Sequence, residues 1–266
     1  MSALRLVHGT NARRNGVAAF HEMNPQDQNC AVMFDPHPDD ADFWTGGLTL
    51  LLRKANWQVH YVCCGVTSPE TRMQAEESAR VLDVQRHFLE IPLTGNSRLR
   101  DDLREKAVPL LQQLRPRIAF IPALNDYHQE HCELSRELLP LFRASGRFQF
   151  PMPELYAYDS HEGRDPVEIY IDIASVFDRH MESLRCHRWF AKPDYYPSSD
   201  NTLTRIKTGR SMVLGASLPH PKARTLHAEG YRMIWGHPKE VSTLRLLFPE
   251  QFYFRPSTWM TSMWQT

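Results

Sequence analysis

One stretch near the start of the chain, residues 30–42, restricts the folds that this sequence can adopt. Five apolar residues in a row, Cys30 to Phe34, are typical of a short strand buried on both faces of a parallel sheet. Pro36 and Pro38 end this strand because proline has no N–H to donate to a neighbouring strand. The polar residues of the stretch therefore follow the carboxyl end of a strand, where open α/β sheets bind their ligands.

Four ionisable side chains crowd the turn after this strand, namely His37, Asp39, Asp40 and Asp42. Carboxylates this close repel one another unless a cation or a proton neutralises them, so the turn predicts a metal site. The alternative is a solvated acidic turn in which Asp39 or Asp40 caps the next helix, since aspartate is a favoured N-cap. That alternative accounts for one carboxylate and leaves the others without a role.

The rest of the first half alternates between strands and helices. Alternating links of this kind form βαβ units, so we expect an α/β fold with a mostly parallel sheet. Gly46–Gly47 indicates a close approach of a helix to the sheet or of the backbone to a ligand. The sequence has no GxGxxG, so nothing favours a dinucleotide. The expected strands are 57–64, 87–91 and 117–121, and the expected helices are 48–54, 69–82, 98–114 and 134–141.

Beyond residue 150 the alternation becomes less regular. We expect strands at 154–158 and 168–172, a helix at 174–189, and a long loop at 194–200 that is either a lid or a plain surface excursion. No repeat or linker divides the chain, so we predict a single domain over residues 1–266. It would consist of a surface extension at 1–28, a core at about 30–150 and a part at about 151–266 that sets substrate specificity.

Charge and cysteine content limit the partners and the compartment. Lysine plus arginine and aspartate plus glutamate both number 31, so the zero net charge does not favour a nucleic-acid or membrane partner. Five cysteines without a CxxC pair fit reduced thiols. The sequence also shows no signal peptide and no run of apolar residues long enough to span a membrane. We therefore expect a cytoplasmic protein.

A second group of histidines and acids follows the strand predicted at 117–121. It contains His128, Glu130 and His131, and it should lie at the same edge of the sheet as the first turn. We propose His37, Asp40 and His131 as metal ligands, because two imidazoles and one carboxylate with an open fourth position are typical of catalytic zinc. Iron(II) suits the same ligands.

Zinc in such a site lowers the pKa of its bound water to about 7, which suits the hydrolysis of an amide. Asp39 is placed to take the proton of the water and return it to the departing amine. His128 could be an imidazolium that stabilises the oxyanion, with Glu130 holding His128 in that charge state. Simpler roles are open for each residue: Asp39 as a helix cap, His128 as a fourth ligand and Glu130 as a solvated helix residue.

These motifs resemble those of a known family. His37 to Asp42, followed by Gly46–Gly47, resembles the AHPDDxE…GG signature of the LmbE/PIG-L family of zinc-dependent N-deacetylases, and the segment from His128 to His131 resembles its HPDH motif. Weaker similarities cover Arg72–Glu77, Ile171–Arg188 and Ala228–Tyr231. The resemblance implies a Rossmann-like three-layer sandwich, zinc on His37, Asp40 and His131, Asp39 as general base, and His128 as oxyanion stabiliser.

The resemblance also implies a substrate class. Family substrates are mostly N-acetylglucosamine derivatives, so we expect the removal of an N-acyl group, acetyl above all, from an amino sugar or glycoconjugate, with Arg72 gripping the substrate. Asp42 and Glu130 replace a usual Glu and Asp, and Thr94 stands where the family has an Asp that contacts sugar hydroxyls. The alternatives are a metal- or sugar-binding relative that lacks turnover or has another specificity, and a metal-assisted phosphoester hydrolase.

Overall fold

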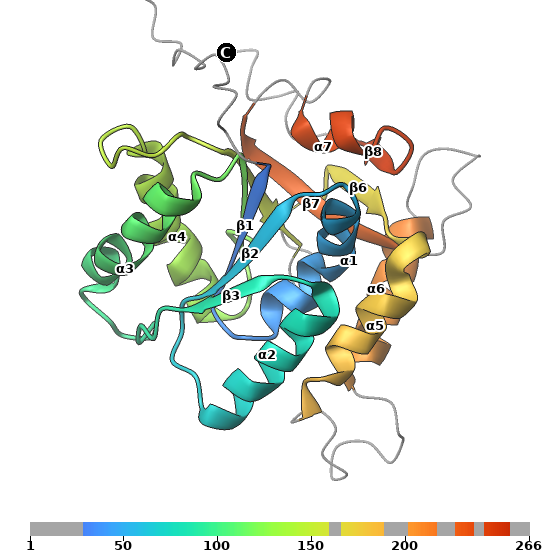
Figure 1. Ribbon diagram of the computed structural model, residues 1–266, viewed down its shortest axis with the longest axis horizontal. Coiled ribbons are helices and arrows are strands. Elements are labelled where there is room, and N and C mark those ends of the chain that lie inside the picture. Colours follow the sequence, from blue (N-terminus) through green and yellow to red (C-terminus); the bar gives the residue numbers. More distant parts are fainter. Residues whose placement is uncertain (1–28, 160–165, 189–201, 217–226, 237–241, 256–266) are drawn as a thin grey trace, which may run out of the picture.

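A computed structural model describes residues 29–159, 166–188, 202–216, 227–236 and 242–255. Within these residues the chain forms one eight-stranded sheet with the strand order β3-β2-β1-β4-β5-β7-β6-β8 (Figure 1). The strands are β1 (Cys30–Asp35), β2 (Gln58–Cys63), β3 (Gln85–Phe88), β4 (Ile118–Ile121), β5 (Glu154–Tyr158), β6 (Ile169–Asp172), β7 (Ala228–Trp235) and β8 (Phe252–Phe254).

The helices are α1 (Asp40–Lys54), α2 (Pro69–Leu82), α3 (Leu99–Leu114), α4 (Gln129–Arg143), α5 (Phe177–Arg185), α6 (Thr202–Ala216) and α7 (Thr243–Leu247), with a short 3₁₀ turn at Ala174–Val176. The predicted extension at 1–28 and the loop at 194–200 lie outside the described residues. None of the described helices is both long enough and apolar enough to cross a membrane.

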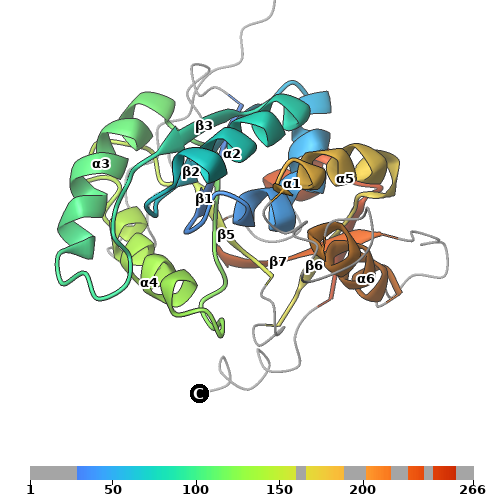
Figure 2. The same ribbon diagram turned by 90° about the horizontal axis from the view of Figure 1, so that it is seen from below.

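The first five strands run parallel and are doubly wound. β1 pairs with β2 on one side and β4 on the other, and β3 and β5 extend the sheet at either end of this group. Residues of α1 share one core with the end of α2, whereas α3 and α4 pack into a second core on the opposite face of the sheet (Figure 2). The direction of winding therefore reverses between β1 and β4, and a crevice at such a point is where open α/β sheets bind ligands.

β1 lies at the centre because its side chains are apolar on both faces. Ala31 and Met33 pack into the α1 core, while Cys30, Val32 and Phe34 pack into the α3–α4 core. This alternation follows from the period of two in a strand. The prediction of a doubly buried strand and a mostly parallel α/β fold is confirmed.

The second half adds antiparallel strands to this core. β7 pairs antiparallel with both β5 and β6, and β8 pairs antiparallel with β6. The strands expected at 154–158 and 168–172 are present as β5 and β6. The helix expected at 174–189 is shorter, because a 3₁₀ turn precedes α5 and α5 ends at Arg185.

Helix α1 begins earlier than expected. It starts at Asp40, directly after the acidic turn, so Gly46 and Gly47 lie inside the helix and not in front of it. A Cβ atom on Gly46 would lie 2.5 Å from the ring of His180, and one on Gly47 would lie 2.6 Å from Ile173. The glycines thus permit the close approach that the sequence predicted, but the partners are α5 and the segment after β6 rather than the sheet.

Buried polar side chains contact the backbone in the middle of α1. The carboxylate of Glu229 accepts the N–H groups of Gly47 and Leu48 at 3.0 and 2.8 Å. Lys207 Nζ donates to the carbonyl oxygen of Phe43 at 2.6 Å and to Glu229 at 2.9 Å. Glu229, which belongs to the third of the weaker family similarities, therefore connects β7 and α6 to the helix that begins at the acidic turn.

Candidate metal centre and active site

The predicted site lies where the winding of the sheet reverses. His37 belongs to the turn after β1, Asp40 is the first residue of α1, and His131 is in the first turn of α4, after β4. The carboxyl ends of β1 and β4 are neighbours in the sheet, so segments that are far apart in the sequence bring these three residues together.

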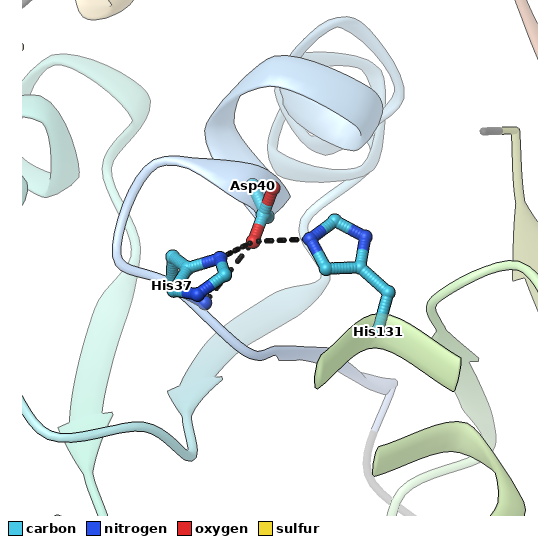
Figure 3. Close-up of side chains that lie close together, drawn as sticks. All are labelled: His37, Asp40 and His131. Atoms are coloured by element: carbon cyan, nitrogen blue, oxygen red, sulfur yellow. Dashed lines mark hydrogen bonds and ion pairs between the residues drawn. The ribbon is translucent and has the colours of Figure 1, made fainter. Parts of the chain in front are cut away.

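Asp40 is the centre of the cluster. Its Oδ2 atom lies 3.0 Å from His37 Nδ1 and 3.3 Å from His131 Nε2 (Figure 3). One donor atom from each residue lies within 4.8 Å of the others, so the three side chains could hold a metal ion. Asp40 and His131 are buried, whereas the side chain of His37 is 34% exposed and borders the open side.

The charges in this cluster favour a cation. Burial lowers the pKa of His37, but the hydrogen bond and charge of Asp40 outweigh burial and raise it to about 9. Burial likewise lowers the pKa of His131, and Asp40 together with Asp126 raises it to about 10. The pKa of Asp40 is well below its usual value, because the two histidines outweigh the effect of its own burial. Without a metal, protons supply the positive charge that Asp40 attracts.

The second ring nitrogen of each proposed ligand histidine contacts a carboxylate. His131 Nδ1 lies 3.1 Å from Asp126 Oδ2, and His37 Nε2 lies 2.5 Å from Glu130 Oε2. Thr94 donates to the other oxygen of Glu130 at 2.7 Å. Carboxylates in this position fix the tautomer and orientation of metal-binding histidines. Asp126 was missed in the sequence, where its one signal is its position in the loop just before the helix that carries His131.

The partner of Glu130 therefore differs from the expected one. We expected Glu130 to hold His128, but its hydrogen bonds go to His37 and Thr94. Glu130 and His128 influence each other through charge alone, since no hydrogen bond joins them in the described part of the chain. The pKa of Glu130 is lowered, because the bonds from Thr94 and His37 outweigh its partial burial.

Asp39 does not act as a helix cap. It occupies the N-cap position of α1, yet its side chain accepts no capping hydrogen bond. Burial and the charge of Asp40 raise the pKa of Asp39 to about 6, against the opposing charges of His187 and His37. Asp39 thus lies beside a proposed ligand and holds or releases a proton close to neutral pH.

His128 lies beside both proposed ligand histidines. Its ring centroid is 4.8 Å from that of His37 and 4.9 Å from that of His131. Its Nδ1 atom is buried and has no hydrogen-bond partner. Burial and the positive charges of His131 and His37 lower the pKa of His128, so the metal-free protein favours a neutral imidazole over the expected imidazolium.

Asp42 anchors the acidic turn from beneath. It is fully buried and accepts hydrogen bonds from Ser78 at 2.8 Å, Arg86 at 2.5 Å and His187 at 3.0 Å. Arg86 also donates to the carbonyl oxygen of Pro38 at 2.5 Å. These contacts tie the turn that carries Asp39 to α2, β3 and the end of α5. Arg86 was not among the predicted residues, because nothing in its local sequence indicates the contact.

Arg72, the predicted substrate-binding residue, is engaged elsewhere. Its guanidinium donates to Glu90 at 2.6 Å and lies over the ring of Phe88, 4.4 Å from the ring centroid. Its described contacts include none with the three proposed ligands. The assignment of Arg72 to substrate binding therefore stays a prediction.

The fold and this cluster define an α/β protein with a candidate metal centre at the switch point of its sheet. Residues 32–141 match the family model of PIG-L, described as GlcNAc-PI de-N-acetylase. The matched part of the chain contains both groups of site residues, and the resemblance to the PIG-L family seen in the sequence is confirmed. At the level of enzyme class, the family match also confirms the prediction of a deacetylase.

Several solved structures share the fold. N,N'-diacetylchitobiose deacetylase from Pyrococcus horikoshii aligns with a TM-score of 0.63 and 21% identity, covering 79% of this chain and 85% of that chain. The 4-carboxy-2-hydroxymuconate hydratase GalB from Pseudomonas putida aligns with a TM-score of 0.61 and 18% identity, covering 79% of this chain and 98% of that chain. Teicoplanin deacetylase, solved in a zinc-inhibited form, aligns with a TM-score of 0.58 and 9% identity, covering 76% of this chain and 96% of that chain.

These identities show a common fold, and the presence of a hydratase shows that the fold alone does not define the reaction. Among curated proteins, no sequence match was found.

Proposed function

We propose that this protein is a zinc-dependent deacetylase that removes an N-acetyl group from an amino sugar or glycoconjugate. The observation that carries the proposal is the convergence of His37, Asp40 and His131 beside an uncapped Asp39, within the part of the chain that matches the PIG-L family. The family description and the chitobiose and teicoplanin deacetylases support the substrate class.

The donor set fits zinc. Two imidazole nitrogens and one carboxylate oxygen face one another, and both imidazoles have a carboxylate behind them. Iron(II) accepts the same donors. We propose zinc because two imidazoles and one carboxylate are typical ligands of catalytic zinc. When bound there, zinc supplies a Lewis acid that lowers the pKa of water to about 7 and polarises the amide carbonyl.

Asp39 moves the proton in the proposed reaction. Its carboxylate accepts a proton from the attacking water as the new C–O bond forms, and it returns this proton to the amine nitrogen as the C–N bond breaks. A pKa of about 6 suits both halves of this transfer near neutral pH. Arg86 and Asp42 hold the backbone of the turn that carries Asp39.

His128 stabilises the negative charge that develops on the carbonyl oxygen. Its ring lies against His37 and His131 and has an unused nitrogen, and a neutral imidazole can donate an N–H to the oxyanion. Glu130 positions His37 in this scheme and does not charge His128. The products are acetate and the free amine of the sugar.

An acetate-release assay on amino sugars of increasing complexity tests the proposal. We expect release by the zinc-loaded protein, loss of release after chelation, and a fall of at least about a hundredfold in kcat for Asp39→Asn with its bound zinc retained. Zinc content by elemental analysis is the control, because it separates a lost base from a lost metal.

Three results would contradict the proposal. Release of phosphate from phosphoesters without release of acetate would favour the metal-assisted phosphoesterase. Acetate release that is unchanged by Asp39→Asn would remove the proposed base. Tight binding of amino sugars without any turnover would favour a non-catalytic relative.

A further inference from the structure

A second group of donor atoms lies directly outside the first. His37, His128 and Glu130 each offer one donor atom within 4.8 Å of the others, as do His37, Asp40 and His131. All three are partly exposed, whereas two members of the inner group are buried. The two groups share His37.

The shared histidine faces both groups at once. His37 Nδ1 lies 3.0 Å from Asp40 Oδ2, on the inner side, and His37 Nε2 lies 2.5 Å from Glu130 Oε2, on the outer side. The two nitrogens of an imidazole point in different directions, so one ring can serve two neighbouring sites. Use of Nδ1 for an inner ion leaves Nε2 available for an outer one.

The other two side chains each place a donor atom close to His37. Thr94 holds Glu130 Oε1 at 2.7 Å and leaves Oε2 directed at His37. The ring of His128 lies 4.8 Å from that of His37, and its Nδ1 is buried without a partner although it is a strong hydrogen-bonding atom. A buried imidazole nitrogen that lacks a partner is an observation separate from the grouping of the three side chains.

We propose that His37, His128 and Glu130 form an outer site for a second divalent ion, and that zinc fills it when zinc is in excess. Two imidazoles and one carboxylate are a set of donors that zinc binds, whereas magnesium and calcium prefer oxygen ligands. The outer ion replaces the proton shared by His37 Nε2 and Glu130. Its three residues are all partly exposed, whereas Asp40 and His131 are buried, so the outer ion binds more weakly and exchanges with solvent.

Filling the outer site has a consequence that rests on the proposed function. An ion on His128 occupies the side chain assigned to the oxyanion, and it stands on the open side of the inner group. Zinc should therefore activate the enzyme with the first equivalent and inhibit it with the second. Binding itself does not depend on the function, because the number of ions can be counted without turnover.

Equilibrium dialysis of the full chain against zinc, after chelation, tests the outer site. We expect two zinc ions per chain at saturation for the native protein and one for Glu130→Gln. The matched control is Glu133→Gln, one turn along the same face of α4, which should still bind two. His87→Gln is a second control, because His60 and His87 meet at 3.1 Å and are another pair of imidazoles that could collect zinc.

His131→Ala separates the two sites, because it removes an inner ligand and leaves the outer group intact. This variant should bind one zinc ion, with the weaker affinity of the outer site. The double variant that combines His131→Ala with Glu130→Gln should bind none. A native protein that saturates at one zinc, or a Glu130→Gln variant that still binds two, would overturn the proposal. If only His87→Gln lost the second ion, that ion would belong to the pair of His60 and His87, and the proposal would also be overturned.

Inhibition gives an independent readout where acetate release is measurable. Excess zinc should inhibit the native enzyme and Glu133→Gln alike, and the inhibition constant should rise at least about tenfold in Glu130→Gln. A protein that binds two ions but releases no acetate would refute the proposed function and leave the outer site standing. A protein that releases acetate but binds one ion would do the reverse.

Discussion

Asp40 lies between two histidines, and each of these histidines has a carboxylate on its far side. The three proposed ligands could be predicted as a group because the carboxyl ends of neighbouring parallel strands meet at one edge of a sheet. Arg86 could not, since its role depends on which side chains meet across the fold, and Asp126 was missed because its closeness to His131 in the sequence does not show that the two side chains meet. The expected partner of Glu130 differs from the observed one for the same reason. Thr94, which holds the Glu130 carboxylate against His37, is distant from Glu130 in the sequence.

Asp126 should tune the affinity for the metal. Asp126→Asn keeps the shape of the side chain but removes the charge behind His131, and losses of this kind typically weaken metal binding about 10–100-fold. We expect that weakening in a competition titration against a chromophoric chelator, with Asp101→Asn on the surface of α3 as the control. Equal affinities of the two variants would contradict a role for Asp126.

Helix α1 shows how surroundings can override a local signal. Gly46–Gly47 suggested a helix that starts after the glycines, because glycine is a poor helix former. In the fold, α5 and the segment after β6 pack closely against these glycines, and Glu229, Lys207 and His180 bind the helix backbone there. The local sequence marks the two glycines as unusual inside a helix. It does not reveal the tertiary contacts that keep this part of the chain helical.

Gly46→Ala should destabilise the protein although alanine favours helices. The added methyl group would meet His180, which is fully buried and donates to the carbonyl of Asp42 at 2.7 Å, so the ring has little room to move. We expect a loss of about 1–3 kcal/mol in urea unfolding, as overpacked cores show.

Gly209→Ala is the matched control for this substitution. Gly209 is also inside a helix, α6, but a Cβ atom there would meet nothing within 4 Å. It should be neutral or stabilise by up to about 1 kcal/mol. If Gly46→Ala were as stable as Gly209→Ala, the close packing against α5 would not restrict the helix.

The whole molecule combines a predictable half with one that was less so. The parallel half follows from its alternation of apolar strands and helices, and its strand order places the site. The antiparallel half was only partly expected, because β7 contains Glu229, Gly230 and Arg232 and so lacks the continuous apolar run of β1. A strand of this composition is stable because β5 and β6 pair with it on both sides.

Stability of the metal-free protein should fall as the pH rises above 6.5. The pKa values of His37 and His131 rise from 6.5 to about 9 and about 10 on folding, so the folded state holds more protons than the unfolded state in this range. Their stabilisation is complete below pH 6.5 and is lost as the pH approaches the folded values. Buried His131 alone contributes a slope of about 1.4 kcal/mol per pH unit.

Urea unfolding of the chelated protein between pH 6.5 and 8.5 checks this dependence. The slope should flatten in His131→Gln. It should also vanish in the zinc-loaded protein, because a metal binds the neutral imidazoles that protons otherwise stabilise. Equal stability of the chelated protein at both ends of this range would contradict the assigned pKa values.

The position of the site also bears on how the sheet holds together. β1 and β4 are joined over just three residue pairs, from Ala31–Ile118 to Met33–Phe120, and beyond them the helices diverge to opposite faces. An ion shared by Asp40 on α1 and His131 on α4 would cross-link the two layers at this narrow seam. The same ion would then stabilise the structure. Removing it should weaken the contact between the two layers and also abolish the proposed reaction.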